Sequence, residues 1–150
     1  MITFSVEKFL ALANQLAELP WPKSGKDFRK IAVERFNWSP TEYDQIYEAS
    51  FDSEKEDVIV SELGNEVDEM FFALMLPGPK EKLDASKLKT LFNNYRTAAS
   101  ETWGEPIKSK AGKEPVVAWQ QPTGSIVKLI RRADVVLFSF YTPQGAKYFA

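Results

Sequence analysis

Carboxylates gathered in one part of the chain are the side chains most able to do chemistry. Between Glu42 and Glu69 eleven residues are acidic and one, Lys55, is basic, which gives a net charge of −10 over 28 residues. The other 122 residues carry 18 basic and 10 acidic groups, so the formal net charge of −2 conceals two regions of opposite sign. Carboxylates in such number can hold a hard cation, exchange protons with a substrate or attract a cationic surface.

The first two of these uses are disfavoured by spacing and composition. Residues 52–57 read Asp-Ser-Glu-Lys-Glu-Asp, without the regular acidic positions and the glycine of an EF-hand loop. Catalysis by a carboxylate pair among Glu66, Asp68 and Glu69 needs a cleft that sequence does not reveal. The chain has no histidine and no cysteine, which removes the commonest general base, the thiolate nucleophile and the usual transition-metal ligands. We therefore expect no enzyme activity, no catalytic residue, no metal and no cofactor.

Two basic segments are candidates for binding phosphate or nucleic acid. Residues 108–113 contain Ala-Gly-Lys, but they lack the glycine spacing of a P-loop and precede an expected strand instead of opening a helix. Arg131-Arg132 lies near several aromatic residues, yet those belong to an apolar run over 135–141 that is typical of a buried strand. The net acidity also opposes a polyanionic ligand. We expect a solvated loop and no nucleic-acid partner.

The remaining use of the acidic segment is attraction of a cationic protein. If its side chains share one exposed sheet face, they mimic a row of phosphates and complement a basic groove. The alternative is a solvated face that protects a sheet edge from aggregation. We expect Trp103 and Trp119 in the core. The expected partner-binding residues are Trp38, Tyr43, Asp44, Tyr47, Glu48, Asp52, Glu54, Glu56, Asp57, Glu62, Glu66, Asp68 and Glu69.

Hydrophobic periodicity predicts the elements that position these residues. Helical spacing of apolar residues predicts helices within 5–36 and over 84–103, and proline at position 143 starts a short helix over 143–149. Alternation and β-branched residues predict three-stranded meanders over 43–76 and 115–141. The order ααβββαβββα predicts a single α+β domain over 1–150, with antiparallel strands in one sheet or two.

Targeting signals are missing from the start of this sequence. Met1-Ile2-Thr3 leads directly into an amphipathic segment, and the longest apolar run, 70–77, is too short to cross a bilayer. We expect a cytoplasmic protein with no membrane partner, as a monomer or weak dimer.

The second half of the chain contains tryptophan, turn and strand motifs that recur in other proteins. They are Trp103-Gly104-Glu105-Pro106, Trp119-Gln120-Gln121-Pro122-Thr123-Gly124, Ile126-Val127-Lys128-Leu129, Val135-Val136-Leu137-Phe138 and Tyr141-Thr142-Pro143. In these motifs the chain resembles a family of uncharacterised small proteins found chiefly in actinobacteria. The resemblance covers 103–150 and only loosely the N-terminal helices, and it implies no catalytic or binding residue. Relatives are encoded near polymorphic or secreted toxins, which implies an immunity role.

These expectations combine into one hypothesis and one alternative. The hypothesis is an immunity protein that neutralises a cognate toxin by direct binding, with the acidic block 42–69 occupying a basic cleft. A nuclease is the electrostatically natural target, and an NAD-consuming toxin remains open. The alternative, by analogy with secretion chaperones of similar architecture, is a chaperone-like adaptor for a secreted substrate.

Overall fold

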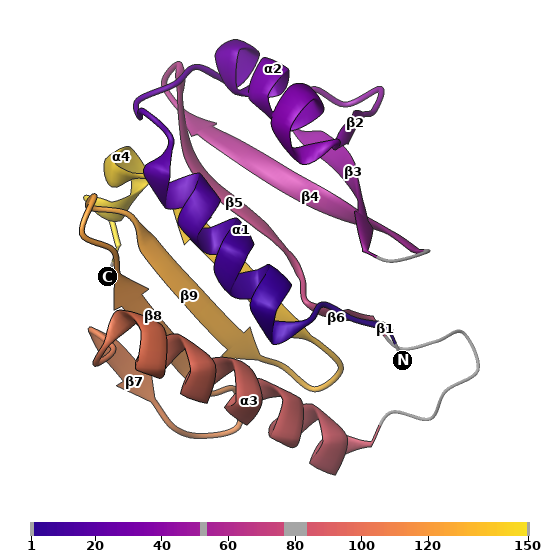
Figure 1. Ribbon diagram of the computed structural model, residues 1–150, viewed down its shortest axis with the longest axis vertical. Coiled ribbons are helices and arrows are strands. Elements are labelled where there is room, and N and C mark those ends of the chain that lie inside the picture. The colour runs from indigo at the N-terminus through magenta and orange to yellow at the C-terminus, as the bar shows by residue number, and fades with distance from the viewer. Residues whose placement is uncertain (1, 52–53, 77–83, 150) are drawn as a thin grey trace.

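The computed structural model describes residues 2–51, 54–76 and 84–149 (Figure 1). In chain order the elements are β1 (Ile2–Thr3), α1 (Val6–Glu18), α2 (Gly25–Phe36), β2 (Ser39–Pro40), β3 (Ile46–Phe51), β4 (Glu54–Leu63), β5 (Glu66–Ala73), β6 (Met75–Leu76), α3 (Ala85–Trp103), β7 (Lys108–Lys110), β8 (Val116–Gln120), β9 (Ile126–Arg131), β10 (Val136–Tyr141) and α4 (Pro143–Ala146). The α+β class and the predicted order of the main elements are confirmed, and the additional strands are short.

Eight of the described strands form one antiparallel sheet, in the order β2-β3-β4-β5-β10-β9-β8-β7. The two predicted meanders join at the centre, where β5 pairs with β10 and Met70 lies opposite Phe140. The short strands β1 and β6 pair separately. The question of one sheet or two, which the sequence left open, is answered by this β5–β10 pairing.

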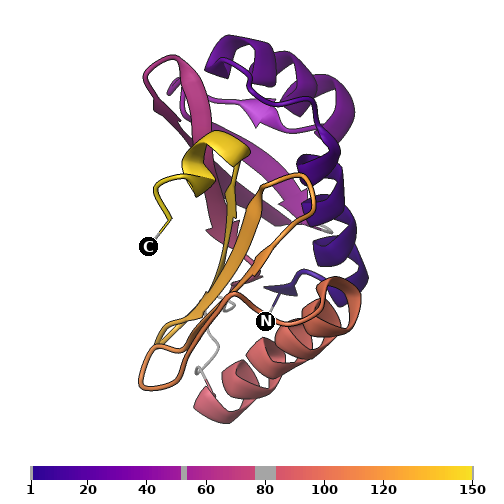
Figure 2. The same ribbon diagram turned by 90° about the vertical axis from the view of Figure 1, so that its left-hand side faces the viewer.

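Helices α1, α2 and α3 lie on one side of the sheet, and α4 lies on the other (Figure 2). Alternate strand residues face the three helices and form the core. In the central strand β10, the Phe138 ring packs edge-on against Phe9 of α1, with ring centres 5.5 Å apart. Phe140, two residues on, lies 6.1 Å from Trp21, which itself stacks on Phe28 of α2. The helix-facing side of the sheet is therefore the dry side.

Helix ends follow the capping signals in the sequence. Ser5, Ser24 and Thr142 each precede a helix, and each side-chain oxygen accepts a hydrogen bond from a backbone N–H two or three positions into that helix. Asp84 caps α3 in the same way through Ser86. Such caps satisfy donors that a helix cannot pair internally.

Two expected boundaries differ in the structure. Lys108–Lys110 lies within the segment expected to be a loop, but it forms the edge strand β7, because Val116 and its neighbours in β8 offer backbone partners. Its side chains are solvated as expected. The C-terminal helix ends at Ala146 rather than at 149. Among the described residues, no helix combines the length and apolar character needed to cross a membrane.

Candidate functional site: an acidic rim beside helix α2

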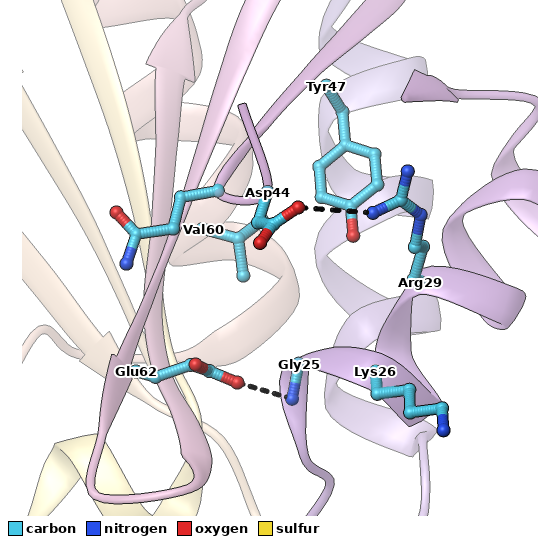
Figure 3. Close-up of a pocket in the computed structure, with 8 residues that line it drawn as sticks. Gly25, Lys26, Arg29, Asp44, Tyr47, Val60 and Glu62 are labelled. Atoms are coloured by element: carbon cyan, nitrogen blue, oxygen red, sulfur yellow. Dashed lines mark hydrogen bonds and ion pairs between the residues drawn. The ribbon is translucent and has the colours of Figure 1, made fainter. Parts of the chain in front are cut away.

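Glu62 is held by the first turn of α2. The backbone N–H of Gly25 donates to Glu62 Oε1 at 2.6 Å (Figure 3). Unpaired N–H groups give a helix N-terminus partial positive charge, which stabilises a carboxylate there. A Cβ at position 25 would lie 2.1 Å from the same oxygen, so glycine permits this close approach. This hydrogen bond orients the Glu62 carboxylate and connects β4 to the first turn of α2.

A pocket of about 440 Å³ opens between α2, the loop before β3 and strand β4. Its lining residues are Gly25, Lys26, Arg29, Asp44, Gln45, Tyr47, Val60 and Glu62. An ion pair joins Arg29 to Asp44 at 3.7 Å, with side chains 42% and 97% exposed. Such a solvated pair contributes at most about 1 kcal/mol to folding. The pocket is therefore polar and lined by both signs of charge.

Tyr47 extends from β3 into this pocket toward Arg29 (Figure 3). Burial raises the pKa of Tyr47, the positive charge of Arg29 lowers it, and the carboxylates of Asp44 and Glu62 raise it further. The phenol thus stays protonated at physiological pH, chiefly because it is buried.

Exposed acids and exposed apolar side chains adjoin residues that line the pocket. Tyr43 is 61% exposed and Leu63 is 51% exposed. Glu42 and Glu66 are exposed, and neither makes an ion pair within the part of the chain that the structure describes. We name this surface the acidic rim, comprising Glu42, Tyr43, Asp44, Glu62, Leu63 and Glu66.

Local hydrogen bonds hold the acidic rim in place. Thr41 Oγ1 donates to the Ile46 carbonyl at 2.8 Å and accepts from the Tyr43 N–H at 3.1 Å, which closes the loop before β3. The N–H of Val60 donates to the Gln45 carbonyl and ties this loop to β4. On the other side, Leu63 and Glu66 pair across the β4–β5 turn. The rim is thus built from the loop before β3 and the β4–β5 turn, which both adjoin the lining of the pocket.

Other acids of the block lie on the side of the sheet opposite to α1–α3. Glu48 and Asp57 pair across β3 and β4. Glu69 sits at the centre of the sheet, where desolvation raises its pKa, while the charge of Lys128 and hydrogen bonds with Tyr141 and Ser139 lower it. Burial has the opposite effect on a cation and lowers the pKa of Lys128. The Nζ of Lys128 donates a hydrogen bond to the Tyr141 hydroxyl at 2.8 Å. Glu69 is therefore half-buried among hydrogen-bonding neighbours and is not displayed on an exposed acidic face.

The rest of the block is dispersed. Glu56 is half-buried on the helix-facing side, and burial raises its pKa. Asp68 lies at a β-bulge and accepts a hydrogen bond from Ser61 Oγ at 2.7 Å. Asp52 lies outside the described residues, and of Glu54 only the backbone is described. The expected single acidic face is thus divided between the two sides of the sheet and the rim at its end.

Two of the three aromatic residues expected to contact a partner are in the core. Trp38 is 5% exposed and Tyr47 is 2% exposed. Trp38 follows Asn37, which ends α2 in a left-handed conformation. The backbone N–H of Trp38 donates a hydrogen bond to the Ala32 carbonyl. A hydrophobic residue just after such a helix end commonly packs back on the helix, a signal that the sequence contained. Tyr43 alone of the three is exposed.

Trp119, expected in the core, is fully buried, and Trp103 is partly buried beside it, with ring centres 5.8 Å apart. Glu42 and Leu63 of the acidic rim and Arg29 of the pocket lining were not among the residues expected to bind a partner. Within residues 2–51, 54–76 and 84–149, no group of three acidic side chains is placed to hold a metal ion.

The chain belongs to DUF6301, a family of unknown function, whose model matches residues 7–142. This confirms the expected membership of an uncharacterised family. No curated protein and no solved structure matches the chain. The association with toxins that the resemblance implied stays a prediction.

Proposed function

We propose that this member of DUF6301 is an immunity protein, which neutralises a cognate toxin by placing the acidic rim against a basic cleft. The observation that supports the proposal is the pair of exposed apolar side chains, Tyr43 and Leu63, each next in sequence to an acid that lines the pocket, Asp44 and Glu62. Glu42 and Glu66 add two exposed carboxylates that make no ion pair with the described residues. Interfaces between proteins typically combine aromatic or apolar anchors with a charged periphery. The acidic rim contains both kinds of side chain around one pocket.

Charge sets the class of partner. Like-signed carboxylates on one end of the molecule accelerate encounter with a basic surface and repel acidic competitors. Fast association suits an inhibitor that must intercept a toxin before it acts. A nuclease is the favoured target because a groove that holds a phosphate backbone is basic. An NAD-consuming toxin is the second target class.

The test reverses charges that have no structural role. The double variant Glu42→Lys and Glu66→Lys changes two exposed acids with no ion pair among the described residues. Glu62 and Glu69 are not substituted in this test. Glu62 accepts a hydrogen bond from α2, and Glu69 is half-buried beside Lys128 and Tyr141, so changing either could disturb the fold. The control, Glu101→Lys with Glu105→Lys, makes the same charge change at exposed positions near the end of α3.

Survival is measured in a heterologous host that expresses the product of the adjacent gene together with each variant. We expect the rim variant to lose protection and the control to keep it, with both proteins folded by circular dichroism. Equal protection by the two variants contradicts the proposal.

A chaperone-like adaptor for a secreted substrate is the second candidate. It is favoured by the sheet side opposite to α1–α3, where Ile59, Phe71 and Leu137 are only partly buried. An adaptor would keep an unfolded apolar segment from aggregating, and the rim variant would retain that activity. Light scattering of a denatured secreted substrate, with and without the chain, distinguishes the two functions.

A further inference from the structure

One row of residues crosses the side of the sheet that α1–α3 leave uncovered. Strand pairing places Ala73 beside Leu137, Leu137 beside Ile130, Ile130 beside Val116, and Val116 beside Lys110. Their neighbours Phe138 and Val117 face the helices, so this row faces the other way. Leu137, Ile130 and Val116 remain partly accessible, and Lys110 is exposed. The row is an apolar stripe that ends in a cation.

The opposite end of the row is acidic. Asp57 is exposed on β4, two residues before Ile59, which pairs with Phe71 of β5. Because residues two apart share a face, Asp57 extends the row beyond Ala73. From β4 to β7 the row therefore runs from an anion to a cation, with apolar side chains between them. Glu48 of β3, which pairs with Asp57, adds a second acid at the acidic end.

The C-terminal segment covers the other end of this side. α4 packs on β5, where a Cβ on Gly145 would lie 2.0 Å from the Asp68 carbonyl oxygen. Beyond α4, the Phe149 ring rests edge-on against Tyr141 at 5.3 Å, and Lys108 Nζ lies 5.6 Å from its centre. The row from Asp57 to Lys110 lies away from Tyr141 along the strands, because Leu137 precedes Tyr141 by four residues in β10.

We propose that this row binds the same row of a second copy of the chain, related by a twofold axis parallel to the strands between β10 and β9. In the sheet order, β4 and β7 lie at equal numbers of strands from that axis. The axis therefore sets Asp57 of each copy against Lys110 of the second copy. A twofold axis perpendicular to the strands would instead set each charge against its own kind, which is repulsive.

The same axis matches the apolar side chains. It sets Leu137 against Ile130 of the second copy, and Ala73 against Val116. In the neighbouring row, Ala118 is fully buried and Ser139 is nearly so, which leaves that row unavailable to a second copy. The C-terminal segments hold the sheets apart at the other end, so the contact is confined to the row from Asp57 to Lys110.

The dimer goes beyond the proposed function and does not depend on it. An axis parallel to the strands keeps both copies pointing the same way, so their acidic rims would lie at one end of the assembly. Two partner molecules would then bind the same end. Loss of dimerisation and loss of toxin binding are measured on different variants and are separable.

The test uses complementary charge reversal and sedimentation. We expect the unaltered chain to sediment as a dimer, and Asp57→Lys and Lys110→Glu each to raise the dimer dissociation constant about tenfold or more. In an equimolar mixture of the two variants, each interface pair again joins opposite charges, so a heterodimer forms. The rim variant Glu42→Lys with Glu66→Lys dimerises like the unaltered chain.

Two results overturn the proposal. One is an unaltered chain that remains monomeric at about 100 μM, a concentration at which even a weak specific dimer is populated. The other is a mixture of the two variants that stays as monomeric as each variant alone, because a twofold arrangement requires their recombination. Circular dichroism of each variant establishes that both fold, so a monomer reports a lost contact.

Discussion

The two halves of the sheet share one plan and differ in their surfaces. Helix α2 is followed by β2, β3, β4 and β5, and helix α3 is followed by β7, β8, β9 and β10. The sheet order runs outward in each half from the paired strands β5 and β10, and α1 lies over this seam (Figure 1). Both halves bury alternate apolar residues against their helices.

Charge separates these two halves. Strands β3–β5 contain eight acidic residues and one basic residue, whereas β7–β10 contain four basic residues and no acidic one. The alternation that builds the core is therefore compatible with opposite surface charges. Architecture and surface charge are thus encoded at different positions of the same strands.

Truncating side chains on the two sides of the paired strands β5 and β10 should change the free energy of unfolding by very different amounts. Phe138 is fully buried on the helix-facing side, and Phe71 is only partly buried on the other side. Phe138→Ala should lower the free energy of unfolding by about 3–5 kcal/mol, because it leaves a cavity against Phe9. Phe71→Ala should cost clearly less. Urea unfolding measures both, and equal losses would contradict the assignment of one dry and one accessible side.

Gly145 of α4 packs against the backbone of Asp68 in β5. Its position against the Asp68 carbonyl leaves no room for a Cβ, so Gly145→Ala should destabilise the protein by about 3 kcal/mol through displacement of α4. The control is Gly64→Ala in the β4–β5 turn, where φ is +66° but nothing lies within 4 Å. Conformational strain alone should cost that variant about 1 kcal/mol. A smaller loss at Gly145 than at Gly64, in urea unfolding, would contradict the contact.

Glu56 makes the acidic half pH-sensitive. Burial raises its pKa above the ordinary 4.5, a hydrogen bond with the Asp57 backbone lowers it by less, and the charge of Asp57 raises it further. A raised carboxyl pKa means that the folded state binds the proton more tightly. The contribution of Glu56 to stability is therefore fully present below pH 4.5 and is lost as pH rises through the raised pKa. Glu56→Gln should remove this loss. Unfolding midpoints between pH 4 and pH 7 test it; an unchanged difference between the two proteins across that range would refute it.

Breaking the ion pair at the pocket should change the free energy of unfolding least. Arg29 and Asp44 are both well exposed, and solvent screens their attraction. Asp44→Ala should change the free energy of unfolding by less than about 0.5 kcal/mol. A thermal melt in low and high salt measures the change. A loss of several kcal/mol would show that the acidic half depends on this pair for its fold.

Much of the fold could be predicted because its signals are local. Spacing of apolar residues predicted α1, α3 and both meanders, and Pro143 marked the start of α4. Strand alternation also contained the information that Glu56 and Asp57 face opposite sides. The expectation of one acidic face failed because it treated the block as a single surface.

The rest depends on contacts between residues distant in the chain. Glu62 is held by Gly25, 37 positions earlier, through a shift of register between Ser61 and Glu62. The edge strand β7 exists because β8 offers it a partner. Neither arrangement leaves a periodic signal in the sequence, so the acidic rim could be recognised only in three dimensions.

Whether the acidic rim binds a toxin is tested by measuring the affinity of the chain for the product of the adjacent gene. Calorimetry at low and high salt compares the unaltered chain, the rim variant Glu42→Lys with Glu66→Lys, and the control Glu101→Lys with Glu105→Lys. We predict that the rim variant raises the dissociation constant about 100-fold or more and that the control stays within about threefold. Equal affinities of the rim variant and the control would show that the acidic rim is not the binding surface.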